Sequence, residues 1–260
     1  MESKNTLENK ILEALKDQQK MFGDLLYEKL GITEGEKKPS VKYGPKPKGK
    51  ITVAEKFELN PGDNLLLEGY QKAADLTELY DSIHNCQNCS LGKTRNKFVF
   101  GAGNPKADVM LIGEAPGAEE DKQGIPFVGR AGKLLTDIIR AIDFEREEVY
   151  IANIVKCRPP QNRNPLPAEV EACIPYLYKQ IELIKPKVIL CLGLVAATSL
   201  FKKKYTLTKM RGNVYDVQGV KTMVTYHPAA LLRNPNWKRG CWEDVKKFKQ
   251  LYNDEVRAQK

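Results

Sequence analysis

Four of the six cysteines in this 260-residue chain have a spacing that suits metal binding. Cys86 and Cys89 form a Cys-x-x-Cys pair, and Cys157 and Cys173 follow further along the sequence. The residues inside such a pair form a turn that carries both sulfurs to the same side, where they can grip one ion or cluster. Zinc and an iron-sulfur cluster both accept four cysteines, and the spacing does not choose between them. The alternative is that these are ordinary buried thiols.

The other two cysteines and the nearby histidine carry weaker signals. Cys191 lies in an apolar run and is expected to be a small core residue, and Cys241 has no partner at ligand spacing. His84 could be a spare ligand, but a surface or capping histidine is the commoner case. The first residues are polar and no apolar run is long enough to span a bilayer, so we expect a cytoplasmic protein without a membrane partner. In that compartment clustered cysteines bind metal more often than they form disulfides.

A second group of residues stands where a predicted strand runs into a loop rich in glycine and proline. Residues 109–112 are an apolar run of strand length, and they lead directly into Gly113-Glu-Ala-Pro-Gly117. Glycine lets the backbone turn sharply and approach a ligand closely, and proline fixes the turn. Ligands of open α/β sheets bind at the carboxyl ends of strands. We therefore expect Glu114, Ala115 and the downstream Phe127 to line a cavity, with a purely structural turn as the alternative.

His227, one of only two histidines, follows another predicted strand and precedes a proline. A histidine at such a place can donate a hydrogen bond to a developing oxyanion. Leu231, Leu232 and Arg233 come next, and they would place apolar wedges beside a cation that binds phosphate. Wedges of this kind hold open a base step in DNA. A helix start that packs into the core would show the same residues.

Asn153 is predicted to end a third strand. Its amide can supply one hydrogen-bond donor and one acceptor to the edge of a base. Taken alone, an asparagine at a strand end is more often a satisfied turn residue, so this prediction depends on the other strand ends. The carboxyl ends of parallel strands meet at one edge of a sheet, and we expect Asn153 to lie near Glu114 and His227 there.

The elements that position these residues alternate along the chain. Strands are predicted near 108–113, 149–154, 187–193 and 221–226, and helices near 129–142, 167–184, 193–202 and 237–258. Such alternation predicts an α/β fold, with a mostly parallel sheet between helices on both faces. A further helix is expected from about residue 64 to 83, leading into the cysteine pair.

The N-terminal quarter differs in composition from the rest. Residues 1–34 have apolar positions at helical spacing and predict a helical extension, which could bind a protein partner. Residues 35–65 are rich in proline, glycine and lysine and predict a flexible linker before the main domain, 66–260. The formal net charge is +9, and because residues 1–65 are nearly neutral, most of it belongs to the main domain. That excess favours a polyanionic partner such as DNA.

Taken together, these residues resemble the family 4 uracil-DNA glycosylases over about residues 75–255. The resemblance rests on the four cysteines and on the segments 113–117, 124–132, Asn153 before 156–160, and 227–233. It implies a three-layer αβα sandwich around a four-stranded parallel sheet, and one four-iron four-sulfur cluster held by Cys86, Cys89, Cys157 and Cys173. It also implies a monofunctional hydrolase, expected to be a monomer, that removes uracil from DNA and so initiates base excision repair.

The resemblance assigns a role to each strand-end residue. The enzyme would bind DNA through its basic surface and flip the uracil outward, with Leu231 as the wedge and Arg233 on the DNA backbone. The flipped ring would stack on Phe127, and the Asn153 amide would accept from uracil N3–H and donate to O4. His227 would donate to uracil O2 as negative charge gathers on the leaving base.

One loop departs from the related family 1 enzymes, which carry an aspartate where Ala115 stands and a tyrosine where Gly117 stands. The usual water-activating carboxylate is therefore missing, as it is in family 4. Glu114 is the candidate to orient water and Asp121 a weaker one, although both could be anions favoured by a helix start. The alternative function is a non-catalytic DNA-binding module with an iron-sulfur cluster or zinc.

Overall fold

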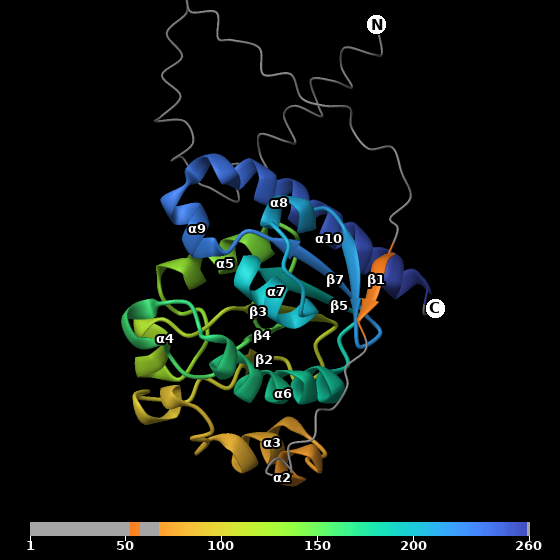
Figure 1. Cartoon of the computed structure of the whole chain (residues 1–260). Coiled ribbons are helices and arrows are strands. Elements are labelled where there is room, and N and C mark those ends of the chain that lie inside the picture. The colour runs from red at the N-terminus through yellow and green to blue at the C-terminus, as the bar shows by residue number, and fades with distance from the viewer. Residues whose placement is uncertain (1–52, 58–67, 259–260) are drawn as a thin grey trace, which may run out of the picture. The chain divides into compact units, whose positions relative to one another are not determined.

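The computed structural model describes residues 53–57 and 68–258, and within them one mixed sheet lies between helices (Figure 1). The predicted helical extension and most of the predicted linker lie outside the described residues. The strand order is β1-β6-β7-β5-β3-β4-β2. The strands are β1 Val53–Phe57, β2 Ala102–Gly103, β3 Val109–Gly113, β4 Tyr150–Asn153, β5 Val188–Leu192, β6 Val214–Val217 and β7 Val220–Thr225.

The four predicted strands form the centre of this sheet. β7, β5, β3 and β4 are neighbours and pair in parallel. Every residue of β3, β4 and β5 is buried, as expected for parallel strands covered on both faces. The prediction of an α/β fold with a mostly parallel sheet is therefore confirmed.

Three further strands make the sheet larger and more mixed than the predicted four parallel strands. β2 pairs antiparallel with β4 and has only two residues, too few for a periodic signal. β6 and β7 form an antiparallel hairpin whose turn residues Gln218 and Gly219 have φ of 53° and 80°. Two positive φ values in sequence are typical of the tight turn that joins twisted strands. β1 pairs parallel with β6 and falls inside the segment predicted as a linker.

The helices are α2 Glu68–Gln71, α3 Leu76–Ile83, α4 Ala118–Gln123, α5 Arg130–Arg140, α6 Pro167–Ile184, α7 Leu194–Phe201, α8 Leu207–Met210, α9 Pro228–Arg233 and α10 Lys238–Ala258. Four of them, α5, α6, α7 and α10, confirm the helices predicted in the main domain. The single helix expected over 64–83 is wrong, because Asp75 starts a new helix by accepting hydrogen bonds from the Thr77 and Glu78 N–H groups. In the part of the chain that the structure describes, no helix is both long and apolar enough to cross a membrane.

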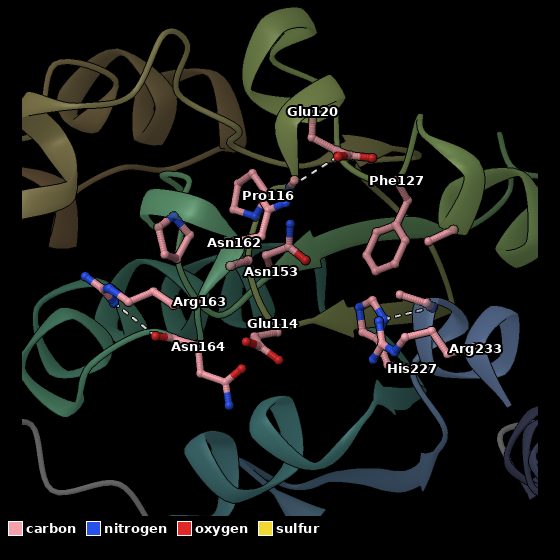
Figure 2. Close-up of a pocket in the computed structure, with 15 residues that line it drawn as sticks. Glu114, Pro116, Glu120, Phe127, Asn153, Asn162, Arg163, Asn164, His227 and Arg233 are labelled. Atoms are coloured by element: carbon pink, nitrogen blue, oxygen red, sulfur yellow. Dashed lines mark hydrogen bonds between the residues drawn. The ribbon is translucent and has the colours of Figure 1, made fainter.

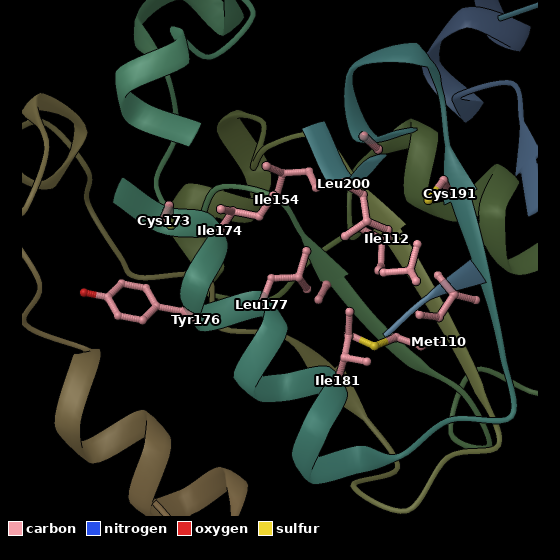
Figure 3. Packing of buried hydrophobic residues seen from close by; sticks show 14 of the residues in the cluster. Met110, Ile112, Ile154, Cys173, Ile174, Tyr176, Leu177, Ile181, Cys191 and Leu200 are labelled. Carbon is pink, nitrogen blue, oxygen red and sulfur yellow. The ribbon is translucent and has the colours of Figure 1, made fainter. Parts of the chain in front are cut away.

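Side chains alternate between the two faces of the central strands. On one face Met110 and Ile112 belong to a buried cluster with Leu177 and Ile181 of α6 (Figure 3). α10 covers the other face, where it packs against β5 and β7. Each fully buried aliphatic side chain contributes about 1.5–3 kcal/mol relative to exposure. With both faces covered, the carboxyl ends of the strands remain as the place where a ligand can enter.

Candidate active site and cysteine cluster

A cavity of about 340 Å³ lies at the carboxyl ends of β3, β4 and β7 (Figure 2). Its walls contain six of the residues selected from the sequence: Glu114, Ala115, Phe127, Asn153, His227 and Arg233. The loop after β4 supplies a further wall through Pro159 and residues 162–164. The three predicted strand ends therefore meet at one cavity, as the parallel topology requires.

Phe127 forms part of the cavity wall and has a strained backbone conformation. Its φ is 52°, in the left-handed region that few residues other than glycine adopt. The ring lies against Gly113 so closely that a Cβ at that position would be 2.6 Å from the ring atoms Cε2 and Cζ. A Cβ on Gly132 would overlap the Phe127 carbonyl oxygen. Gly113 therefore leaves the space for the aromatic ring, and Gly132 leaves the space for the Phe127 backbone.

Glu120, which the sequence reasoning missed, holds this loop in place. Its Oε1 accepts hydrogen bonds from the Val128 and Gly129 N–H groups, both at 2.9 Å. Its Oε2 accepts from Gly117 N–H at 3.1 Å. One carboxylate thus joins the turn after β3 to the segment that follows Phe127. A glutamate three residues after the N-cap Gly117 can accept from the N-cap N–H, as in the second half of a capping box, and this spacing was the signal that could have found it.

Asn153 ends β4 in register with Gly113 and is only 2% exposed. Its side chain lies among the cavity residues in Figure 2. Within the described residues, its Oδ1 is a buried acceptor with no hydrogen-bond partner. Buried acceptors are nearly always paired, because an unpaired one costs about 1–3 kcal/mol. The amide oxygen is therefore positioned for a donor that a ligand brings.

His227 is held as a neutral hydrogen-bond donor. Its Nδ1 accepts from the Ala229 N–H at 3.1 Å, so the neutral ring carries its proton on Nε2. Burial, and then the charge of Arg233, lower the pKa of His227 to about 4. The ring centroid is 5.5 Å from that of Phe127. Gly193 makes room for this position, since a Cβ there would lie 2.9 Å from the His227 Cβ.

Three carboxylates lie in or near the cavity, and two of them, Glu120 and Asp121, already accept hydrogen bonds from the protein. Glu114 lines the cavity, and burial raises its pKa above the ordinary value. Glu120 is taken up by the backbone N–H groups described above. Asp121, expected as a weaker water-orienting group, is wrong for that role: it is absent from the cavity walls and accepts from Asn96 N–H at 2.9 Å and Nδ2 at 2.5 Å.

The structure does not place Leu231 as an exposed wedge. Leu231 is 0% exposed, because it lies on the inward side of α9, which packs against α5. Leu232, the next residue, is 39% exposed and stands beside Arg233 at the cavity. The sequence reasoning recognised the pair of leucines but could not tell which of the two faces solvent, since that depends on how the short helix docks.

The four cysteines predicted to bind metal gather in one region. Cys157 and Cys173 are buried members of the main core cluster, and Cys86 and Cys89 are partly buried and pack against it. Among the described residues, no three His, Cys, Asp or Glu side chains are arranged so that they could hold a metal ion. Cys191 is fully buried in β5, as predicted for a core residue. His84 caps the end of α3 with Nδ1 3.2 Å from the Tyr80 carbonyl oxygen, in line with the capping role.

Hydrogen-bond donors lie against three of the four sulfurs, those of Cys86, Cys157 and Cys173. Three of these contacts come from nitrogen: Asn88 N–H to Cys86 Sγ at 3.4 Å, Lys156 N–H to Cys173 Sγ at 3.3 Å, and Arg95 Nη1 to Cys157 Sγ at 3.3 Å. The hydroxyl of Tyr176 lies 3.2 Å from Cys86 Sγ. Burial raises the pKa of Cys157 to about 11 and that of Cys173 to about 12, while donors directed at sulfur act in the opposite sense and favour the thiolate. Hydrogen bonds of this kind tune iron-sulfur clusters. The donor set therefore fits a thiolate-bound cofactor.

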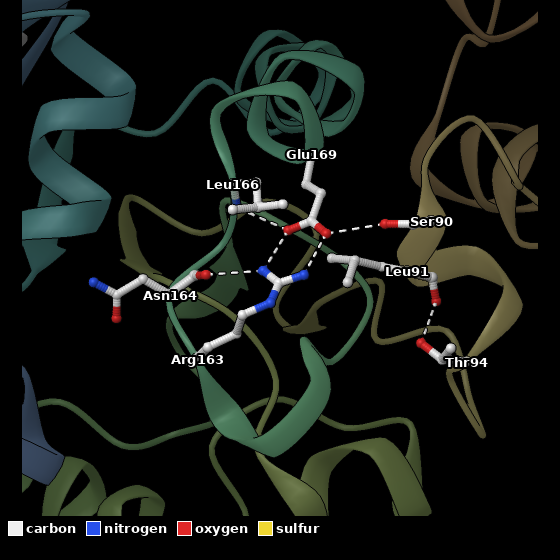
Figure 4. A network of polar contacts seen from close by, with 7 residues as sticks. All are labelled: Ser90, Leu91, Thr94, Arg163, Asn164, Leu166 and Glu169. Atoms are coloured by element: carbon white, nitrogen blue, oxygen red, sulfur yellow. Dashed lines mark hydrogen bonds and ion pairs between the residues drawn. The ribbon is translucent and has the colours of Figure 1, made fainter.

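A buried carboxylate joins the segment of Cys89 to α6, the helix that carries Cys173 (Figure 4). Glu169 accepts from both terminal nitrogens of Arg163, at 2.8 and 2.7 Å, from Leu166 N–H at 2.7 Å and from Ser90 Oγ at 3.0 Å. Arg163 is the main reason that the pKa of Glu169 falls to about 2. Ser90 directly follows Cys89, and Glu169 lies one helical turn before Cys173. This clamp, formed by Glu169, Arg163 and Ser90, was not anticipated from the sequence.

Comparison with known proteins gives a consistent result. The sequence profile of the Uracil DNA glycosylase superfamily matches residues 100–249. The type-4 uracil-DNA glycosylase of Archaeoglobus fulgidus is 45% identical over 184 residues, which are 68% of this chain and 92% of that protein. The type-4 enzyme of Saccharolobus solfataricus is 48% identical over 185 residues, 68% of this chain and 86% of that protein. The type-4 enzyme of Thermotoga maritima is 45% identical over 179 residues, 67% and 93% respectively.

Proposed function

This chain belongs to the type-4 uracil-DNA glycosylases, and we propose that its cavity receives a uracil flipped out of DNA and hydrolyses the N-glycosidic bond. The enzyme is a hydrolase of DNA repair that leaves an abasic site. The observation that carries the proposal is the unpaired, buried Oδ1 of Asn153 in the same cavity as the His227 donor. Uracil presents an N–H group between two carbonyl oxygens, so a matching site needs one acceptor flanked by two donors.

Asn153 and His227 supply that pattern. The Asn153 Oδ1 accepts from uracil N3–H, and its Nδ2 donates to O4. The His227 Nε2–H donates to O2 on the other side of N3. Cytosine carries an acceptor at N3 and a donor at its exocyclic amine, so both amide contacts would be mismatched in a buried site. Sites of this kind reject the wrong partner strongly, because their own polar groups are left unpaired.

Phe127 provides the face on which the flipped ring stacks. Stacking of a base on an aromatic side chain contributes about 1–3 kcal/mol. The ring already lies against Gly113, and the Phe127 backbone lies against Gly132, so little ordering is required when the base enters. Ala115 lines the same cavity with a small side chain, where it leaves room for the base.

His227 acts on the leaving base. As the glycosidic bond breaks, negative charge gathers on uracil, and the neutral imidazole donates from Nε2 to O2. A pre-positioned donor of this kind lowers the barrier by about 3 kcal/mol. Because the pKa of His227 is about 4, the ring is already neutral at neutral pH and keeps its proton on Nε2.

Glu114 is the group assigned to orient the attacking water. Among the described residues its side chain has no hydrogen-bond partner, whereas Glu120, the other carboxylate of the cavity, binds the loop backbone. Its raised pKa reflects an environment that disfavours the charge, and a developing cationic sugar would offset that cost. This assignment replaces the aspartate that family 1 enzymes carry at the position of Ala115.

The DNA strand itself contacts residues at the mouth of the cavity. Arg233 binds a phosphate of the backbone, which positions the strand without reading its sequence. Leu232, rather than Leu231, is the exposed apolar side chain that fills the space left by the flipped base. The cytoplasmic location, the monomeric state and a protein partner for residues 1–34 stay predictions.

Cys86, Cys89, Cys157 and Cys173 are the residues that would hold the four-iron four-sulfur cluster implied by the family. The cluster, when bound, supplies a cross-link between the segment after α3, the segment after β4, and α6. The surrounding N–H donors and the Glu169 clamp already hold these segments together. The role is therefore structural, since these contacts order the loop that forms one wall of the cavity.

The test uses a labelled oligonucleotide with one uracil, beside a thymine control, and alkaline cleavage of abasic sites. We expect cleavage only at uracil, together with the visible absorption of an iron-sulfur cluster. Asn153→Ala and His227→Ala should each lower the excision rate by at least about tenfold, roughly 1.4 kcal/mol. Wild-type rates in both variants would refute the assigned roles. An inactive wild-type chain that retains its cluster would favour the non-catalytic DNA-binding module instead.

A further inference from the structure

We propose that Trp237 is a stacking platform for an unflipped nucleobase of the DNA next to the excised uracil, outside the catalytic cavity. The proposal rests on the function proposed above. Trp237 ends the short 3-10 helix Pro235–Trp237 and is 41% exposed. The other tryptophan of the chain, Trp242, is 5% exposed. An indole with this exposure leaves apolar surface open to a flat aromatic partner.

Stacking on Tyr226, which Arg211 contacts in turn, holds the Trp237 ring in place. Tyr226 stacks on Trp237 with ring centroids 5.1 Å apart and an interplanar angle of 18°. The Arg211 guanidinium lies over the Tyr226 ring, 4.0 Å from its centroid, and donates to the Tyr226 hydroxyl. Arg211 is fixed in turn by Asp244, with nitrogen-oxygen distances of 2.6 and 3.2 Å. Three flat groups thus form a stack that rests on α10.

The short helix that carries Trp237 packs against α9, which carries the cavity residue Arg233. Tyr226 directly precedes His227, and Trp237 follows Arg233 by four residues; both His227 and Arg233 line the cavity. No acidic residue occurs from position 228 to 239, where Arg233, Lys238 and Arg239 occur, and Arg239 lies 3.7 Å from Glu243 of the next helical turn. A surface of this composition attracts the phosphate backbone. Trp237 therefore lies near enough to the cavity residue Arg233 for the strand that carries the flipped nucleotide to reach it.

The chemistry of base flipping creates the need for such a platform. A base that leaves the helix exposes a face of its neighbour, and the unstacking costs a few kcal/mol. An exposed indole offers that neighbour a new partner whatever its identity, since every base has a flat aromatic face. The pre-formed support by Tyr226 and Arg211 means that little side-chain entropy is lost when a base stacks there.

The first test uses the fluorescence of the unmodified full chain. Because Trp242 is buried, a change in emission on DNA binding reports on Trp237. The probe is a duplex with one uracil analogue whose glycosidic bond resists cleavage. We expect quenching of the wild-type emission at saturating DNA, and no comparable change in Trp237→Phe. Unchanged wild-type emission at saturation would overturn the proposal without reliance on any variant that might misfold.

The second test measures affinity for the same duplex. Trp237→Ala should weaken binding by about 5- to 150-fold, the range expected for one stacked base, and Trp237→Phe should recover most of the loss. The slope of log affinity against log salt should not change, since no charge is removed. Inhibition by free uracil should also be unchanged, because the cavity is intact. Tyr205→Ala is the matched control, since Tyr205 is 40% exposed and does not line the cavity.

The outcomes separate this inference from the proposed function. Wild-type affinity in Trp237→Ala, with normal uracil excision by the wild-type chain, would overturn the platform and leave the glycosylase assignment standing. A Trp237→Ala loss that is accompanied by weaker inhibition by free uracil would also overturn it, because the damage would then lie in the cavity. Failure of the wild-type chain to excise uracil would instead count against the proposed function.

Discussion

Replacing Gly113 by alanine tests whether base recognition depends on the close approach of Asn153 and Phe127 to β3. The new Cβ would lie 2.6 Å from two atoms of the Phe127 ring, and closer still to Asn153 Oδ1. Ordinary contact begins near 3.4 Å, so both side chains would have to retreat by roughly 1 Å. A misplacement of about 1 Å in an active site can lower the rate by about 100-fold. We therefore expect kcat/KM for uracil-containing DNA to fall about 100-fold, or roughly 2.7 kcal/mol.

The assay compares kcat/KM and the thermal midpoint of Gly113→Ala with those of Gly69→Ala. Gly69 lies in α2, where an added Cβ meets nothing within 4 Å, so this control should keep wild-type activity. A Gly113→Ala protein that melts like the wild type and excises uracil at the wild-type rate would refute the reasoning. So would equal losses in the two variants, because the effect would then not come from the crowded position.

Three other predictions concern groups around the site. The pKa of His227 is about 4 when folded and about 6.5 when unfolded, so this residue lowers the unfolding free energy as pH falls from about 6.5 to 4. When urea unfolding is measured across that window, the unfolding free energies of the wild type and His227→Ala should converge at the acidic end. Glu169 has a pKa near 2 when folded, so it stabilises the fold above its unfolded pKa of about 4.3, and this stability is lost as pH falls toward 2. Glu169→Gln should therefore melt at a lower temperature at neutral pH and release iron faster to a chelator. An unchanged melting temperature would contradict the clamp. Leu231→Ala should lower the free energy of unfolding in urea by about 2–5 kcal/mol, because Leu231 is buried. Leu232→Ala should leave stability unchanged and weaken DNA binding. The reverse pattern would return the wedge role to Leu231.

The central fold was predictable because its signals are local and repeated. Apolar runs of strand length end at 113 and 153, and the helices between them have the spacing of a buried face. Parallel topology then brings the strand ends to one edge, which is why Glu114, Asn153 and His227 could be placed together before their geometry was known. The family resemblance contributed the roles, which the residues alone did not determine.

The parts that sequence reasoning missed depend on contacts across the fold. β1 gains its partner from β6, more than 150 residues away, so its own composition resembles the linker around it. Whether Leu231 or Leu232 is exposed is decided by the docking of α9 on α5. The same is true of Glu120, whose hydrogen bonds reach a loop eight or nine residues away. Short helices and single carboxylates carry too few residues to show a period, so only the packed structure reveals their positions.

The segment after β4 ties the cysteines to the base-reading site. Asn153 ends the strand and Cys157 follows four residues later, with the fully buried Lys156 between them. Lys156 Nζ donates to the Asn153 carbonyl oxygen at 3.0 Å and to Gln180 Oε1 at 2.6 Å, while its N–H donates to Cys173 Sγ at 3.3 Å. A movement of Cys157 or of Cys173 would therefore displace Lys156, which is bonded to the Asn153 backbone. Because recognition depends on an amide held within hydrogen-bond tolerance, we infer that the cysteine-bearing segments serve base selection as well as stability.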